Sequence, residues 1–148
     1  MSLENKIMND IKSAMLMKDS LRLEVLRAIK SEILLVKTDK QSTSLTEKKE
    51  IEILQKLLKQ RTDAAKIYNE QGRTDLAENE KNQAAVVSTY LPKPYTIEQI
   101  EDLVDSVMQE LDITSVQQMG KLISIVIQRA KGRADGKTLS DCVKKKLI

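Results

Sequence analysis

The sequence predicts an all-α protein, in which an N-terminal helical bundle of about four helices precedes a three-helix C-terminal domain. Glycine and proline, the residues that most often interrupt helices, number only four and two among 148 residues. Apolar residues recur three or four positions apart through most of the chain, which is the spacing of a helix with one buried face. The β-branched run at residues 123–127 lacks flanking alternation or hairpin signals, so it also favours helix.

Two amphipathic helices are predicted first, over about residues 3–17 and 20–37. Their apolar positions are spaced so that they align on one face of each helix. These positions are Leu3, Ile7, Ile11 and Ala14 in the first helix, and Val25, Leu26, Ile29, Ile33 and Val36 in the second. The polar, turn-prone stretch over 38–45 predicts a loop before the third helix.

A long third helix is predicted over 46–71, with Ser44 or Thr46 as its N-terminal cap and Gly72 as its C-terminal cap. Its predicted buried seam consists of Ile51, Leu54, Leu58, Arg61, Ala65 and Tyr68. The cation in this seam needs a partner, and Arg61 is expected to pair with an acidic residue of the fourth helix, Glu78 or Glu80. That helix is expected to start at residue 74 or 75 and to stop before the proline at 92.

The segment over 91–95 contains both prolines of the chain and predicts a boundary between domains 1–91 and 92–148. After it, Thr96 and Gln99 have the spacing of a capping box that opens a fifth helix. The sixth helix is expected to begin at Ser115 or Gln118 and, because it is apolar nearly all round, to be the buried centre of the domain. Gly132 ends it, and a short seventh helix follows, capped by Thr138 or Ser140 and carrying Leu139, Val143 and Leu147.

The composition excludes much catalytic chemistry. The chain has no histidine, which removes the commonest general base and metal ligand, and we expect neither catalytic residues nor a metal or other cofactor. The single Cys142 is expected to be a packed thiol, although the three lysines after it could lower its pKa. A lone cysteine fits a reducing compartment, and no apolar signal or membrane segment is evident, so a cytoplasmic location without membrane contact is expected.

The sharpest local feature is the charged loop over 131–137, with Gly132 and Gly136. It does not fit a nucleotide-binding P-loop, which has four residues between its glycines and follows a strand. Two interpretations remain open: a helix-helix turn, or an anion site in which backbone N–H groups approach a phosphate and Lys131, Arg133 and Lys137 supply charge. Residues 113–148 contain eight lysines or arginines against two acidic residues, which permits a polyanionic partner and also fits a solvated helical surface.

Several segments together resemble the GatB/YqeY family of small bacterial proteins. They are residues 26–33, 59–68, 72–78, 90–92, 119–121 and 131–137, and the last, with Gly132-Arg133-Ala134-Asp135-Gly136-Lys137, is the most specific. The sequence departs from the family pattern at residues 94–95, 112–113 and 118, in loops and caps that leave the basic loop intact.

The resemblance implies a C-terminal domain similar to the tail domain of the B subunit of tRNA-dependent amidotransferases, where that domain contacts tRNA. It therefore implies a tRNA-binding helper module, which is not catalytic alone because the amidase and kinase-like parts of such complexes are absent from this sequence. The expected nucleic-acid-binding residues are Lys121, Lys131, Gly132, Arg133, Gly136 and Lys137. The family is often labelled with carbon–nitrogen ligase activity that uses glutamine as amido-N-donor.

Two alternatives stay open. The chain could be an accessory subunit of an amidotransferase, with amidotransferase or aminoacyl-tRNA synthetase components as partners, or a protein-interaction module that docks a partner through the long helix over 46–71. The sequence does not specify an oligomeric state.

Overall fold

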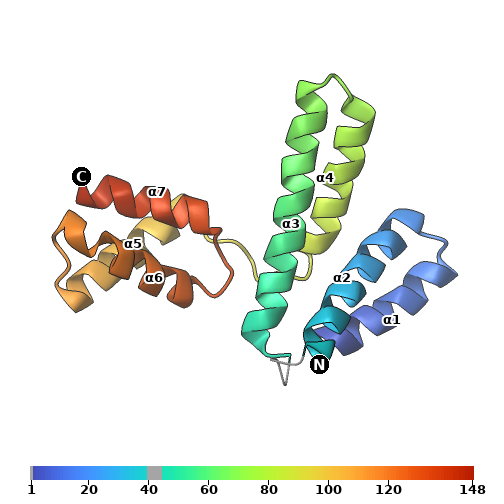
Figure 1. The fold of residues 1–148 in the computed structure, drawn as a ribbon, viewed down its shortest axis with the longest axis horizontal. Helices are drawn as coiled ribbons and strands as arrows, with labels where there is room; N and C mark the ends of the chain where they lie inside the picture. The colour runs from blue at the N-terminus through green and yellow to red at the C-terminus, as the bar shows by residue number, and fades with distance from the viewer. Residues whose placement is uncertain (1, 40–44) are drawn as a thin grey trace. The chain divides into compact units, whose positions relative to one another are not determined.

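The computed structural model describes residues 2–39 and 45–148, and over these ranges it contains seven α-helices, one short 3-10 helix and no strand (Figure 1). The predicted all-α class is confirmed. The chain divides into two compact units, Met1–Leu91 and Pro92–Ile148. Most of the predicted loop over 38–45, including Ser44, lies outside the described residues.

The N-terminal unit contains α1 (Leu3–Leu16), α2 (Ser20–Thr38), α3 (Glu47–Glu70) and α4 (Thr74–Ser88). Three of these helices begin at a side-chain cap: Ser2, Asp19 and Thr46 each accept a hydrogen bond from a backbone N–H three residues further on. The predicted cap at Thr46 is confirmed. Gly72 follows α3 with φ of +75°, the left-handed conformation that ends a helix and that glycine adopts without strain.

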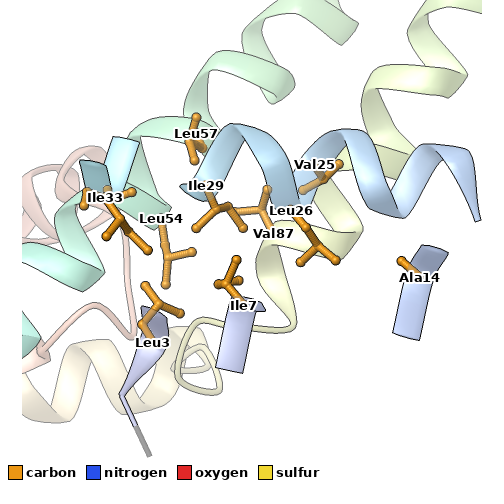
Figure 2. Close-up of a cluster of buried hydrophobic side chains, with 11 residues drawn as sticks. Leu3, Ile7, Ala14, Val25, Leu26, Ile29, Ile33, Leu54, Leu57 and Val87 are labelled. Atoms are coloured by element: carbon orange, nitrogen blue, oxygen red, sulfur yellow. The ribbon is translucent and has the colours of Figure 1, made fainter. Parts of the chain in front are cut away.

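All four helices contribute to one hydrophobic core (Figure 2). Its buried residues are Leu3, Ile7, Ala14, Val25, Leu26, Ile29, Ile33, Ile53, Leu54, Leu57 and Val87. The predicted seam of α3 is partly wrong, because Ile53 and Leu57 are buried whereas Ile51 and Leu58 are only half-buried. Helix α3 packs against both α2 and α4, so its buried stripe is rotated from the one that a single partner helix would require.

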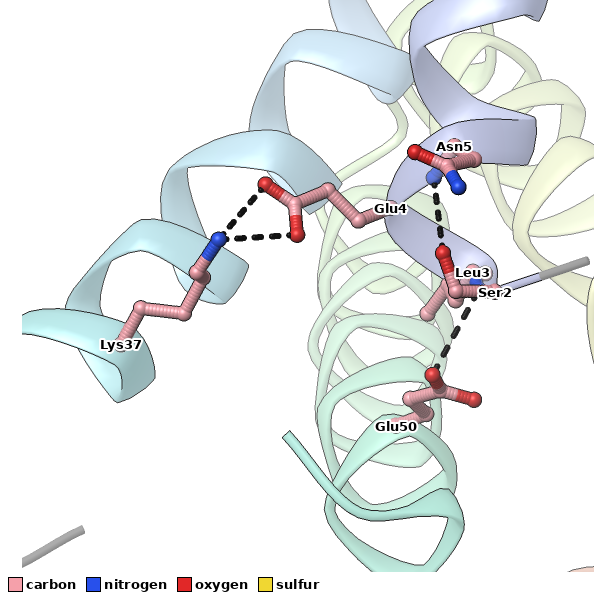
Figure 3. Close-up of polar contacts among 6 residues, drawn as sticks. All are labelled: Ser2, Leu3, Glu4, Asn5, Lys37 and Glu50. Atoms are coloured by element: carbon pink, nitrogen blue, oxygen red, sulfur yellow. Dashed lines mark hydrogen bonds and ion pairs between the residues drawn. The ribbon is translucent and has the colours of Figure 1, made fainter. Parts of the chain in front are cut away.

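Polar contacts join the first turn of α1 to two other helices (Figure 3). Lys37, near the end of α2, donates to both carboxylate oxygens of Glu4 at 3.0 Å. The backbone N–H of Leu3 lies 3.4 Å from a carboxylate oxygen of Glu50 in α3, which supplies an acceptor that the first turn of a helix lacks. These contacts fix the end of α1 against α2 and α3.

The predicted pairing of Arg61 is wrong. Its Nε donates to the side-chain oxygen of Gln83 in α4 at 3.1 Å, and its terminal nitrogen donates to the backbone oxygen of Leu57. Gln83 is only 5% exposed, whereas Glu78 is exposed. The Arg61 guanidinium therefore contacts the neutral side-chain amide of Gln83, because α4 is rotated so that Gln83 faces α3.

Tyr90 is anchored at the end of the N-terminal unit. Its hydroxyl donates to the carboxylate of Asp10 in α1, and Arg22 of α2 lies 3.6 Å from the same carboxylate. Burial and then the bond to Asp10 raise the pKa of Tyr90 to about 12.

The C-terminal unit contains α5 (Ile97–Leu111), the 3-10 helix η1 (Val116–Gln118), α6 (Met119–Ala130) and α7 (Gly136–Leu147). The capping box of Thr96 and Gln99 is confirmed, with both reciprocal hydrogen bonds present. The buried core is formed by Ile100, Val104, Val107, Ile113, Leu122, Val126, Ala130, Leu139 and Val143.

Two predictions for this unit are corrected. Helix α6 is not buried all round, since Ile127 is 44% exposed and only one face packs against α5 and α7. The last helix begins at Gly136, earlier than a cap at Thr138 or Ser140 would allow, because the side chain of Asp135 accepts a hydrogen bond from the backbone N–H of Thr138.

Candidate nucleic-acid interface

Charge is segregated among the three long helices of the C-terminal unit. Helix α5 carries five acidic residues and no basic one, whereas α6 and α7 together carry six lysines or arginines and one aspartate. The acidic residues Glu98, Glu101, Asp102 and Asp105 follow a helical spacing that places them opposite the buried face of α5. The basic surface of this unit therefore lies on α6 and α7.

Two of the basic residues are used within the unit. Arg129 of α6 forms a two-nitrogen contact with the carboxylate of Glu110, with one bond of 2.9 Å, and Lys146 of α7 lies 3.0 Å from Asp105. The hydrogen bond from Arg129 lowers the pKa of Glu110, and the one to Asp105 raises the pKa of Lys146. These solvent-facing pairs connect α6 and α7 to α5 and leave their charges balanced.

Five lysines on α6, on α7 and in the loop between them are exposed and form no ion pair within the part of the chain that the structure describes. They are Lys121, Lys131, Lys137, Lys144 and Lys145, which we call the free lysines. On α7, Lys137 and Lys144 are two turns apart, about 10 Å along the helix, on the side opposite the buried Leu139 and Val143.

The structure brings Lys131 and Lys137 to the same end of the unit, where they flank the loop over 131–135 that joins α6 to α7. Lys121 lies in the first turn of α6, ten residues before Lys131 and therefore about 15 Å from it along the helix. The predicted residues thus extend along α6 and do not form one compact cluster. Lys144 and Lys145 were missed, although their spacing from Lys137 on a helix starting at Gly136 would have shown them on the same side.

The two glycines have different surroundings. Gly132 follows Lys131, and both adopt left-handed φ values, of +81° and +49°, which end α6. Gly136 is the exposed first residue of α7, with no atom within 4 Å of where a Cβ would stand. The carboxylate of Asp135 occupies the start of α7, where it accepts the N–H of Thr138 at 2.6 Å. This helix terminus is therefore already capped by an anion from the chain itself.

Arg133 is held by the segment that enters the unit. Its Nε donates to the backbone oxygen of Lys93 at 2.8 Å, and its guanidinium carbon lies 4.0 Å from the centre of the Tyr95 ring. The backbone N–H of Tyr95 in turn donates to the backbone oxygen of Arg133 at 2.6 Å. Sequence reasoning missed both partners, which lie about forty residues from Arg133 and are joined to it only by the fold.

Cys142 packs half-buried against the core of the C-terminal unit, as a structural thiol does. Burial raises its pKa, and this effect outweighs the opposing influence of Lys146 and Lys145. The suggestion that the pKa of this thiol falls below its usual value is therefore wrong, although Lys146 and Lys145 do act in that direction.

Outside the C-terminal unit, a groove of about 420 Å³ lies between α3 and α4, with Ala65 and Ala84 among its lining residues and Lys66 and Lys81 on opposite helices. Over residues 2–39 and 45–148, no group of three or more cysteine and carboxylate side chains has the arrangement of a metal site. Within the same ranges, no helix is both long and apolar enough to span a bilayer.

Fold and site together define a class of small, all-helical proteins whose C-terminal three-helix unit exposes lysines on two of its helices. A family model described as Yqey-like protein matches residues 4–147, nearly the whole sequence. The chain therefore belongs to the GatB/YqeY family, as its sequence motifs indicated.

Curated relatives come from two yeasts, and both are named altered inheritance of mitochondria protein 41, mitochondrial. The protein of Lachancea thermotolerans is 33% identical over 82 residues, which cover 55% of this chain and 44% of the relative. The protein of Kluyveromyces lactis is 29% identical over 133 residues, which cover 88% of this chain and 68% of the relative. This chain thus spans less than half of the first relative and about two thirds of the second.

Proposed function

We propose that the protein is an RNA-binding helper module that binds tRNA through its C-terminal unit and has no catalytic activity alone. The observation that carries the proposal is the set of five free lysines on α6, α7 and the loop between them. Lysines without a carboxylate partner can neutralise phosphates at no cost in broken ion pairs, and five of the eight acidic residues of the unit, which would repel RNA, lie on α5. The motif over 131–137, shared with the GatB/YqeY family, lies within this set.

The proposal has a quantitative consequence. If each free lysine contacts one phosphate of double-helical RNA, the logarithm of the binding constant falls with the logarithm of salt concentration with a slope of about −4.5. Between about 50 and 200 mM salt, affinity should then fall about 500-fold.

Fluorescence anisotropy with labelled tRNA over a salt series tests this directly. The double variant Lys137→Gln with Lys144→Gln should reduce the slope by about 2, because it removes two phosphate contacts. The matched control, Lys30→Gln with Lys66→Gln, alters two exposed lysines of the N-terminal unit and should leave the slope unchanged. Absent or salt-independent binding by the wild-type protein would contradict the proposal.

A role beside an amidotransferase follows from the family resemblance, with amidotransferase or aminoacyl-tRNA synthetase components as partners. Transamidation of mischarged Glu-tRNA or Asp-tRNA should require partner subunits and should not occur with this chain alone. Amide transfer by the purified chain would contradict the non-catalytic assignment. We further propose that the protein works in the cytoplasm, because a single cysteine, Cys142, fits a reducing compartment.

The groove between α3 and α4 favours a second candidate, a module that docks a partner protein through the N-terminal unit. Small alanines at this groove leave room for a side chain of a partner. A partner recovered equally with and without nuclease, and lost in Ala65→Gln with Ala84→Gln, would favour this candidate over RNA binding.

A further inference from the structure

We propose that Arg133 is a positioning residue of the RNA-binding surface, which orders the loop carrying Lys131 and leading to Lys137 and does not itself bind phosphate. This inference rests on the proposed function. Arg133 then holds the loop over 131–135 to the segment over 93–95 and is not one of the residues that contact the RNA. We call this set of contacts the clasp.

The clasp consists of three contacts between Arg133 and the segment over 93–95. The Arg133 side chain donates to the backbone oxygen of Lys93, its guanidinium covers the ring of Tyr95, and its backbone oxygen accepts the N–H of Tyr95. The Tyr95 ring also packs against the hydrophobic core of the unit. The stacked guanidinium is therefore attached to a ring that is itself held in place.

The exposure of the loop residues agrees with this division of roles. Lys131 and Lys137 are exposed, whereas Arg133 between them is half-buried. A planar guanidinium that lies on an aromatic ring and donates through Nε has an orientation set by the protein. Phosphate contacts by the lysines do not require breaking any such arrangement.

The clasp matters because the loop over 131–135 has few other attachments. Its first two residues are left-handed, the N–H of Arg133 bonds to the oxygen of Ala130, and Asp135 caps α7. The small side chain of Ala134 packs against the core of the unit. Arg133 is the point at which this five-residue loop is attached to the segment over 93–95. Without that attachment the loop would sample more conformations, and binding would have to order them, which lowers affinity without changing the number of phosphate contacts.

Salt dependence distinguishes a positioning residue from a phosphate contact. In tRNA anisotropy titrations, Arg133→Gln should weaken binding about three- to tenfold at every salt concentration and leave the slope unchanged. The matched variant Lys137→Gln should lower the slope by about 0.9. Arg133→Lys should not rescue affinity, because an ammonium keeps the charge but loses the planar stack and the Nε donor.

A second measurement needs no RNA. Hydrogen exchange of the Tyr95 amide should be at least several-fold faster in Arg133→Gln and Arg133→Lys than in the wild-type protein. Tyr95→Leu should weaken tRNA binding to a similar extent, and combining it with Arg133→Gln should add little, because both changes open the same clasp. Circular dichroism of each variant checks that the helices are retained.

A slope reduced by about 0.9 in Arg133→Gln and restored in Arg133→Lys would show that Arg133 contacts a phosphate. That result would overturn this inference and leave the proposed function standing. Unchanged exchange at Tyr95 would also overturn it. If the wild-type protein does not bind tRNA, the proposed function fails, and the exchange of Tyr95 alone then decides whether Arg133 holds the segment over 93–95.

Discussion

Replacing Arg61 with leucine tests the polar contact between α3 and α4. The side-chain oxygen of Gln83 is buried and accepts from Arg61 Nε at 3.1 Å. Arg61→Leu removes this donor and leaves a buried acceptor without the bond that the structure shows, which costs about 1–3 kcal/mol. We expect the free energy of unfolding of the N-terminal unit to fall by about 2 kcal/mol, while its helices remain formed.

Urea and thermal denaturation followed by far-ultraviolet circular dichroism measure this loss. For a unit of this size, about 2 kcal/mol lowers the melting temperature by roughly 8–16 °C. The double variant Arg61→Leu with Gln83→Leu removes both polar partners and should recover most of the stability. A single variant as stable as the wild type, or a double variant no more stable than the single one, would refute this reasoning. Complete loss of helical signal in the single variant would contradict the expectation that the helices remain formed.

Three further predictions concern single side chains. The pKa of Tyr90 is raised from 10.0 to about 12, so the stability that its protonated hydroxyl contributes is full below pH 10 and is lost between pH 10 and 12. After discounting for solvent screening, this loss in the free energy of unfolding is about 1 kcal/mol. Alkaline denaturation of Tyr90→Phe should not show this loss. Asp135→Ala removes the cap of α7 and should cost about 1 kcal/mol in urea denaturation, whereas Asp135→Asn should restore most of it; equal losses in both variants would contradict a capping role. Cys142, whose pKa is raised by burial, should react with iodoacetamide several-fold more slowly than a cysteine in a short peptide, and an equal or faster rate would show an accessible thiolate.

Local signals predicted most of the fold. The cap at Thr46, the left-handed Gly72 and the capping box of Thr96 and Gln99 each depend on residues within one helical turn, so the sequence alone suffices to locate them. The start of α7 was misplaced because Asp135, Thr138 and Ser140 are all acceptable caps, and tertiary packing selects among them.

Contacts between helices were harder to predict than the helices. Charge alone favoured a carboxylate as the partner of Arg61, but the rotation of α4 about its axis presents Gln83 instead. Lys144 and Lys145 were missed because Lys137 was placed in the loop before α7. Only when the helix starts at Gly136 does Lys137 lie on the same helix side as they do. The commitment of Arg133 to Lys93 depends on how a distant segment returns to the loop, which no local spacing encodes.

The segregation of charge within the C-terminal unit has a kinetic consequence. With five negative charges on α5 and a net of five positive charges on α6 and α7, the unit possesses an electric dipole. The field of the proposed RNA partner would exert a torque on this dipole and turn the basic helices toward the RNA before contact is made. Encounters in the wrong orientation are thereby suppressed, and added salt should slow association more than it hastens dissociation. Helix α5 would then face away from the bound polyanion, where it leaves an acidic surface open to solvent.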